Sequence, residues 1–457
     1  MQQNNRAFLG TAPIGKLLFK LSVPTVAAQL INMLYNIVDR IYIGHMPGDG
    51  NLALTGVGVC MPIIMFVSAF AALISGGGAP RASIFMGKGD HQNAEKTLSN
   101  CFALQLIVSL ITTAVLILFG EPMLRAFGAS DNTVSYAIDY MSIYALGTAF
   151  VQLTLGMNGY ITAQGFSSIA MLTVLIGALL NIALDPLFIF GMKMGVRGAA
   201  LATILSQGVS CAWVLHFLTG KKTALRIRKE YLRIRKATVL PCIALGAAPF
   251  IMQSSESIIS VCFNSSLLSY GGDVAVGAMT ILTSVMQFAL LPLQGLAQGA
   301  QPITSFNYGA GHADRVKKTF RLLLTISFSY SCILWLLIQL CPQVFAGIFT
   351  PDPELLAFSA KALRIYFGSI FLFGVQIACQ MTFVAIGYAK SSIIVAVMRK
   401  FILLLPLIYL MPALMSDKTM AVYTAEPIAD FLAVTFTALL FSKQFKKAIS
   451  TLCEKSY

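Results

Sequence analysis

Long apolar stretches, separated by short polar segments, recur along the whole chain. Each is roughly 20 residues long, which is the length that an α-helix needs to cross a bilayer. The stretches are continuous rather than alternating in polarity, so they predict helices and not the strands of a barrel. The pattern predicts twelve membrane spans, at 17–44, 52–78, 97–119, 133–157, 166–190, 197–219, 239–267, 274–304, 319–343, 359–386, 391–414 and 421–442.

The composition supports a membrane protein. Hydrophobic residues make up 57% of the chain and charged residues only 11%, against about 25% charged residues in soluble domains. The net charge of +14 does not indicate nucleic-acid binding, because the basic residues gather in short loops between the spans. By the positive-inside rule these loops are cytoplasmic, which predicts a multi-pass protein of the cell membrane with both termini in the cytoplasm. The loops concerned are 87–96, 220–236, 309–318 and 443–450.

The two halves of the chain repeat. Residues 50–97 align without gaps to residues 272–319, and this alignment pairs Gly87 with Gly309 and Pro80 with Pro302. Each half has six spans, so the halves share one orientation, as in transporters with a substrate site between two parallel repeats. The predicted fold is therefore all-α, with two six-helix lobes around a central cavity. The domains expected are an N-terminal lobe, a basic cytoplasmic linker and a C-terminal lobe with a short basic tail, at 1–219, 220–238 and 239–457.

Several carboxylates interrupt the apolar spans. Asp39, Asp185 and Glu256 are the clear cases, and Asp430 lies nearer the start of a helix. A charged group at the centre of a bilayer costs about 2.5–3.5 kcal/mol on insertion scales and usually has a function. Three further acids fall at predicted membrane interfaces, where solvation explains them: Asp139, Glu354 and Glu426.

Spacing places polar partners beside two of these acids. Asn181 precedes Asp185 by one helical turn, and Tyr35 precedes Asp39 by one turn. A carboxylate and an amide oxygen at this spacing could bind Na⁺ or share a proton. Two structural alternatives remain open: a local ion pair of Asp39 with Arg40, or simple bonding of the Asn181–Asp185 pair to a neighbouring helix.

The second half does not repeat these acids. The repeat places Asn264 opposite Asp39, and the stretch at 400–412 has no Asp to match Asp185. A purely structural requirement shared by both lobes would be expected in both. We therefore predict that ion coupling belongs to the first lobe.

Four segments resemble the multidrug and toxic compound extrusion (MATE) family of secondary transporters, and in particular its MepA-type and DinF-type bacterial branches. They are "LSVPTVAAQLINMLYNIVDRIYIG", "AQGFSSIAMLTVLIGALLNIALDPLFIFG", "GVRGAALATILSQ" and "AEPIADFL". The resemblance implies a V-shaped pair of lobes. It also implies the export of cationic, amphipathic drugs in exchange for H⁺ or Na⁺, an activity associated with antibiotic resistance.

The resemblance also implies roles for individual residues. The family's cation site in the first lobe corresponds to Asp39, Asn181, Asp185 and Thr203, which would be metal ligands only if Na⁺ is the coupling ion. Tyr35, Tyr140 and Asn158 correspond to polar residues that line the same cavity. Glu256 corresponds to an acid of the second lobe that some branches use for Na⁺. Those branches add an Asp in the tenth span, which is absent here, so Glu256 is interpreted as a contact for a cationic substrate.

Two other classes of function fit the sequence less well. A flippase for lipid-linked oligosaccharides or peptidoglycan precursors should place basic residues in its cavity, whereas only Arg40, Arg399 and Lys400 lie clearly within spans. A membrane enzyme should show a metal cluster or a catalytic constellation, and the sequence has none. We therefore predict no catalytic residues, no cofactor beyond the coupling ion, and no nucleotide or nucleic-acid partner. The expected partners are drug-like small molecules and the bilayer, with the chain acting as a monomer.

Overall fold

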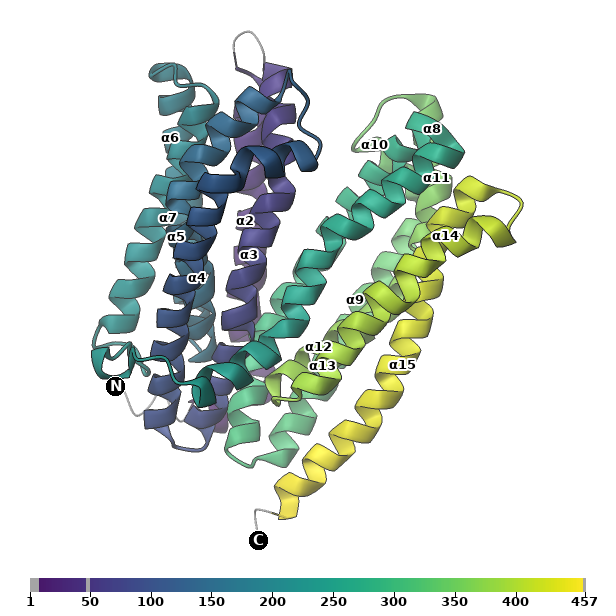
Figure 1. Ribbon diagram of the computed structural model, residues 1–457. Helices are drawn as coiled ribbons and strands as arrows, with labels where there is room; N and C mark the ends of the chain where they lie inside the picture. The colour runs from purple at the N-terminus through teal and green to yellow at the C-terminus, as the bar shows by residue number, and fades with distance from the viewer. Residues whose placement is uncertain (1–7, 47–49, 455–457) are drawn as a thin grey trace.

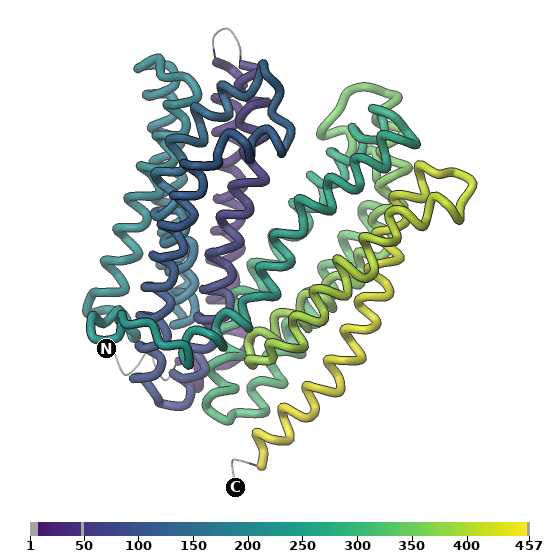
Figure 2. Tube along the Cα trace, viewed as in Figure 1, coloured from purple at the N-terminus to yellow at the C-terminus, as the bar shows by residue number. Residues whose placement is uncertain are grey.

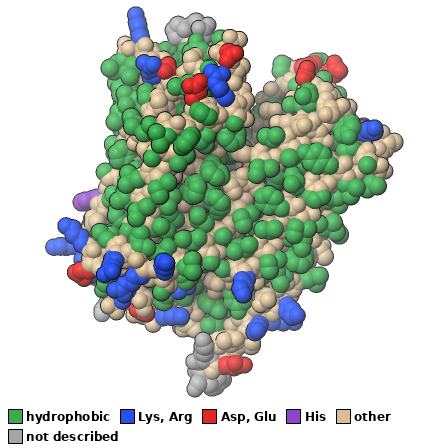
Figure 3. Space-filling view, in the orientation of Figure 1, with side chains coloured by type: hydrophobic (Ala, Val, Ile, Leu, Met, Phe, Trp, Pro, Cys, Tyr) green, Lys and Arg blue, Asp and Glu red, His purple; other side chains and the backbone are tan. Residues whose placement is uncertain are grey.

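Two diverging helical bundles make up the computed structural model, which describes residues 8–46 and 50–454 (Figure 1). The bundles meet at one end and separate at the other, and the Cα trace shows the same arrangement (Figure 2). Lys and Arg side chains gather at the end where the bundles meet (Figure 3). We call this the basic end.

The first bundle contains six spans. The order is α2 (Ile14–Gly44), α3 (Gly50–Gly87), α4 (His91–Ala126), α5 (Val134–Ala163), α6 (Ser167–Pro186) with its π-helical continuation η1 (Leu187–Gly191), and α7 (Val196–Thr219). Every predicted span of the first half falls within one of these helices, apart from one residue before the start of each of the helices α5 and α6.

The second bundle contains the remaining spans, several of them broken. The order is α8 (Lys236–Gly309), α9 (Ala313–Leu340), α10 (Pro342–Gly347), α11 (Pro353–Tyr366), η3 (Ile370–Leu372), α12 (Phe373–Ala385), α13 (Ala389–Val397), η4 (Met398–Leu404), α14 (Leu405–Leu414) and α15 (Lys418–Glu454). α11 and α12 meet at an angle of 47° and together form one bent span.

The count of spans agrees with the prediction of twelve once α8 is divided. Nine helices of the described residues are long and apolar enough to cross a membrane, or ten with the bent pair. α8 is 74 residues long and contains two spans, because Gly272 at φ 64° breaks its helical backbone. α5, with 30 residues, is long enough to be the twelfth. The all-α fold with two lobes is confirmed.

The repeat is visible where the bundles touch at the basic end. A Cβ on Gly87 of α3 would overlap the carbonyl oxygen of Phe306, and a Cβ on Gly309 of α8 would overlap that of Ile84. The same offset that pairs Gly87 with Gly309 also pairs Ile84 with Phe306, so each half makes the same contact to the other. Only glycine lets two helix backbones approach this closely.

Replacing Gly87 by alanine is expected to open this contact and to lower the melting temperature of the purified protein by several degrees. The matched control is Gly58→Ala in the same helix, where an added Cβ meets nothing within 4 Å. Alanine at that position should be neutral or slightly stabilising, because it favours the helix. Thermal unfolding of both variants in detergent measures the difference, and equal melting temperatures would contradict the tight contact.

The basic segment between the bundles is fastened to the first of them. The side-chain oxygen of Gln164, at the end of α5, accepts hydrogen bonds from the backbone N–H groups of Ala224 and Leu225, both at 2.8 Å. Asn100 of α4 donates to the carbonyl oxygen of Tyr231 at 2.8 Å and accepts from the N–H of Arg235 at 2.7 Å. Residues 223–235 therefore follow the first bundle up to the start of α8.

The turn between α3 and α4 shows how local chemistry ends one span and begins the next. Gly89 adopts a positive φ of 75°, a conformation that favours glycine, and Gly311 repeats it at 78° between α8 and α9. Asp90 then caps α4 by accepting a hydrogen bond from the N–H of Asn93 at 3.1 Å. These bonds to Asn93 lower the pKa of Asp90 below its usual value.

Candidate functional site

A cluster of polar side chains lies inside the first bundle. α2 contributes Asp39, α6 contributes Asn181 and Asp185, and α7 contributes Thr203. The amide nitrogen of Asn181 donates to Oδ1 of Asp185 at 3.3 Å and to Oγ1 of Thr203 at 3.4 Å. The carboxyl groups of Asp39 and Asp185 lie close enough to interact with one another. We call these four residues the first-bundle cluster.

The cluster contains buried oxygen atoms without donors. Oδ1 of Asp39, Oδ1 of Asn181 and Oδ2 of Asp185 have no hydrogen-bond partner among the described residues. Their residues are 6%, 2% and 0% exposed, so solvent does not satisfy them either. A buried carboxylate without a partner is costly, and two of them close together repel one another. The arrangement therefore suits a small cation or a shared proton.

The donor set fits a hard cation rather than a transition metal. Carboxylate, amide and hydroxyl oxygens are the ligands that hard cations prefer. Within the described residues, no group of three or more His, Cys, Asp or Glu side chains could hold a metal ion. If Na⁺ binds here, two carboxylates and the neutral oxygens of Asn181 and Thr203 would have to coordinate it.

Tyr35 and Tyr140 lie next to the first-bundle cluster. The hydroxyl of Tyr140 on α5 contacts Thr203, and its ring stacks on Tyr144 with centroids 6.1 Å apart. Tyr35 lies one turn before Asp39 on α2, close enough to interact with it electrostatically. Both tyrosines therefore lie beside the first-bundle cluster.

Asn158 lies elsewhere. It follows Tyr140 by eighteen residues along α5, which corresponds to about 27 Å at the rise of an α-helix. Its amide donates to the carbonyl oxygen of Ala170 at 3.1 Å. Asn158 therefore lies about five helical turns from Tyr140 and is not part of the first-bundle cluster.

The alternative ion pair between Asp39 and Arg40 is not formed. Adjacent residues of a helix point about 100° apart, and Asp39 is buried whereas the side chain of Arg40 is exposed. Asp39 instead faces α6, which packs directly against α2.

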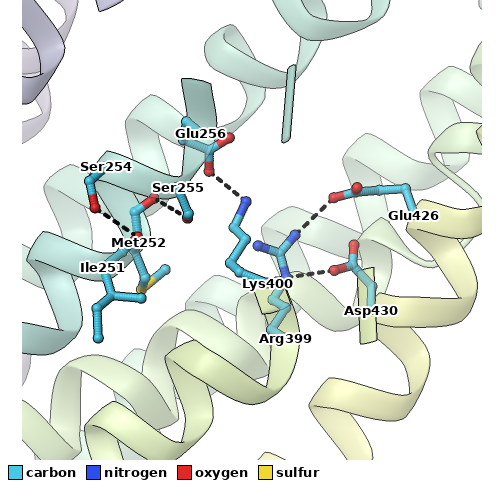
Figure 4. A network of polar contacts seen from close by, with 9 residues as sticks. All are labelled: Ile251, Met252, Ser254, Ser255, Glu256, Arg399, Lys400, Glu426 and Asp430. Carbon is cyan, nitrogen blue, oxygen red and sulfur yellow. Dashed lines mark hydrogen bonds and ion pairs between the residues drawn. The ribbon is translucent and has the colours of Figure 1, made fainter. Parts of the chain in front are cut away.

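A second cluster of charges lies in the other bundle (Figure 4). Nε of Arg399 donates to Oδ1 of Asp430 at 2.7 Å, and its Nη2 donates to Oε1 of Glu426 at 3.0 Å. The next residue, Lys400, donates to Oε1 of Glu256 at 2.5 Å. We call these five residues the second-bundle ion network.

This network corrects one sequence interpretation. Glu426 was expected to be solvated at the membrane interface, but only 4% of the residue is exposed and its carboxylate is paired with Arg399. Asp430 is likewise buried and paired. A signal was present: Glu426 and Asp430 are four residues apart on one face of a helix, and two basic residues lie in the preceding span.

Glu256 combines exposure with an internal partner. Its side chain is 53% exposed, whereas that of Lys400 is 4% exposed. The carboxylate is available to a ligand, as the sequence interpretation requires, but it already accepts a hydrogen bond from a cation. This partner was not foreseen from the sequence.

Comparison with known proteins identifies the family. The MatE family model matches the chain twice, at residues 24–187 and 247–410, in agreement with the repeat. The multidrug export protein MepA of Staphylococcus haemolyticus is 23% identical over 95% of both chains. MepA of Staphylococcus aureus strain MSSA476 is 21% identical over 96% of this chain and 97% of its own.

Solved structures share the fold. A MATE protein in a bent conformation superposes with a TM-score of 0.92 at 23% identity, over 98% of this chain and 99% of its own. An outward-facing multidrug resistance MATE transporter superposes with a TM-score of 0.90 at 23% identity, over 97% and 98%. Because the two matches of the family model together span more than half of the sequence, the chain belongs to the MatE family of multi-pass membrane transporters, the MATE transporters.

Proposed function

We propose that this protein is a secondary active multidrug efflux transporter, which exports cationic amphipathic compounds in exchange for H⁺ or Na⁺ by alternating access. The observation that carries the proposal is the first-bundle cluster, with its two interacting carboxylates and its oxygen atoms without donors. The relatives named multidrug export proteins support the direction and the kind of cargo.

The coupling ion is proposed to bind at Asp39, Asn181, Asp185 and Thr203. Two carboxylates in a buried site cannot both remain charged at low cost, so a proton or Na⁺ relieves their repulsion. The free energy of packing α2 against α6 therefore depends on whether the first-bundle cluster holds an ion. That difference would favour one conformation of the transporter over the other.

The substrate is proposed to bind between the bundles. Figure 3 shows the surface hollowed there, at the end opposite the basic end. Glu256 supplies a negative charge from α8, and Tyr35 and Tyr140 supply aromatic rings on the side of the first-bundle cluster. Asn158, further along α5, is proposed as a polar residue that lines the cavity away from the coupling ion.

The orientation follows from the charges. The basic end is proposed to face the cytoplasm of a cell, with both termini on that side. The bundles separate at the other end, so the conformation described here is proposed to face outward, and a monomer is proposed as the working unit. The lobes are proposed to divide at the basic segment 220–238, with 1–219 and 239–457 on either side.

The charges of the second bundle do not favour the flippase alternative. A flippase for an anionic pyrophosphate lipid would need basic groups that are free to meet the phosphates. Arg399 and Lys400 are instead buried and engaged by three carboxylates. A cationic cargo agrees better with this balance of charge.

Transport of ethidium by purified protein in vesicles tests the proposal. Ethidium should move against its own gradient when a pH gradient or a Na⁺ gradient is imposed alone, and whichever gradient drives transport identifies the ion. An ionophore that dissipates this gradient should stop accumulation within the assay. Accumulation without any ion gradient would refute antiport.

A further inference from the structure

The second-bundle ion network is unbalanced. It contains the carboxylates of Glu256, Glu426 and Asp430 but only the two cations of Arg399 and Lys400. With all five groups ionised it carries one negative charge in excess. A net charge inside a membrane protein is costly unless a further partner compensates it.

Only one member of the network can meet that partner directly. The side chain of Glu256 is 53% exposed, whereas those of the other four are 4–5% exposed. A ligand therefore reaches the network at the carboxylate of Glu256. The excess charge is available at this point and nowhere else in the network.

Glu256 lies on a polar face of α8. Ser260 and Asn264 follow it at intervals of four residues, and both are exposed. Ile259 and Phe263, on the side of the helix that borders this face, are buried in the core of the second bundle. Exposed polar residues at the middle of a span face a water-filled cavity rather than lipid, so Glu256 points into the space where the cargo is proposed to bind.

Lys400 places a fixed positive charge beside any ligand of Glu256. Its Nζ donates to Oε1 of Glu256 at 2.5 Å, and its stem is held in the π-helical segment η4 (Figure 4). A ligand with one positive charge brings the network to neutrality. A second positive charge on the ligand would exceed that balance and be repelled by the nearby ammonium group.

We propose that Lys400 is a specificity-determining residue that restricts the cargo of this site to compounds with a single positive charge. The inference rests on the proposed function, in that it takes the compound bound near Glu256 to be a cation. Beyond the proposed function, it specifies that the cation carries one positive charge. This number follows from the balance of three carboxylates and two basic groups.

Ethidium and propidium form a suitable pair of probes, because they share one ring system while propidium carries a second cationic group. Binding is measured by fluorescence on the purified protein in detergent without any ion gradient. The wild-type protein is expected to bind ethidium at least about ten-fold more tightly than propidium. Lys400→Gln should raise propidium affinity roughly ten-fold and remove the preference, whereas Lys400→Arg, which keeps the charge, should retain it.

The larger size of propidium affects the wild type, Lys400→Gln and Lys400→Arg alike. Only a change in the ratio of ethidium affinity to propidium affinity between these proteins is therefore informative. An unchanged ratio in Lys400→Gln overturns the inference. If that variant does not fold, Glu256→Gln is used, because its exposed side chain (53%) does not support the core. It should weaken ethidium binding at least about ten-fold and reduce the ratio, and an unchanged ethidium affinity overturns the inference.

The outcome is separable from that of the proposed function. A shifted ratio in a protein that fails to couple ethidium transport to any ion gradient would support the role of Lys400 and refute antiport. An unchanged affinity ratio in a protein that does couple ethidium transport to an ion gradient would refute the role of Lys400 and support antiport.

Discussion

Asp39→Asn and Asp185→Asn are each expected to reduce gradient-driven efflux of ethidium to the level of vesicles without protein, while the folded variant remains in the membrane. The reason is that an amide keeps the size of the carboxylate but neither takes up a proton nor neutralises Na⁺. Both residues are buried and their carboxyl groups lie close together, so solvent does not replace the lost charge and each variant leaves only one carboxylate for the ion. Initial rates of efflux in vesicles under an imposed gradient measure the effect.

Three variants serve as comparisons. Asp139→Asn removes an exposed carboxylate that pairs with Arg197, and it should retain efflux because surface ion pairs contribute little. Asn181→Ala and Thr203→Ala each remove one neutral oxygen from the first-bundle cluster and should weaken ion dependence by less than either Asp variant.

Glu256→Gln distinguishes the two bundles. It is expected to change the range of compounds exported and to leave the ion requirement intact. Loss of ion dependence in Glu256→Gln, together with normal coupling in Asp39→Asn and Asp185→Asn, would place the coupling site in the second bundle and reject the assignment.

Arg399→Met is expected to lower the free energy of unfolding by about 3–5 kcal/mol, because it leaves the buried carboxylates of Glu426 and Asp430 without their cation. The guanidinium also lies 4.8 Å from the ring centroid of Phe373, a contact that would be lost. Thermal unfolding in detergent should show a much lower melting temperature.

The matched control is Arg125→Met. Arg125 also pairs with two acids, Glu121 and Asp131, at 3.0 Å each, but its side chain is 45% exposed. Its removal should cost less than about 1 kcal/mol. The triple variant Arg399→Met/Glu426→Gln/Asp430→Asn should recover most of the lost stability, since no buried charge is then unpaired. If Arg399→Met and Arg125→Met lower the free energy of unfolding equally, the burial of the second-bundle ion network does not increase the cost of removing its arginine.

The fold could be predicted from the sequence because its main determinants are local. The length of an apolar run decides whether a helix crosses the bilayer, and the gapless alignment of 50–97 with 272–319 gives the relation between the bundles. The continuity of α8 was not foreseen, since a single residue, Gly272, makes the turn between its two spans. That turn leaves the helical hydrogen bonding on either side almost uninterrupted.

The two charged clusters differ in how far the sequence indicates them. The pairing of Asn181 with Asp185 follows from their spacing on one helix. The pairing of Arg399 with Glu426 and Asp430 joins residues 27 and 31 positions apart, on different helices. It also depends on the π-helical backbone of η4, which changes the directions of two adjacent side chains and has no evident signal in the composition.

The contact of Gly87 with Phe306 and of Gly309 with Ile84 has the form of an isologous dimer interface, in which one patch meets a copy of itself. An ancestral chain of half this length could have used the same patch to pair with a second copy in the same orientation. In such a dimer a substitution in this patch would have acted twice, once on each side of the axis. In a single chain each half is free to vary alone, and the carboxylates of the first bundle and the ion network of the second are differences that two identical copies could not hold.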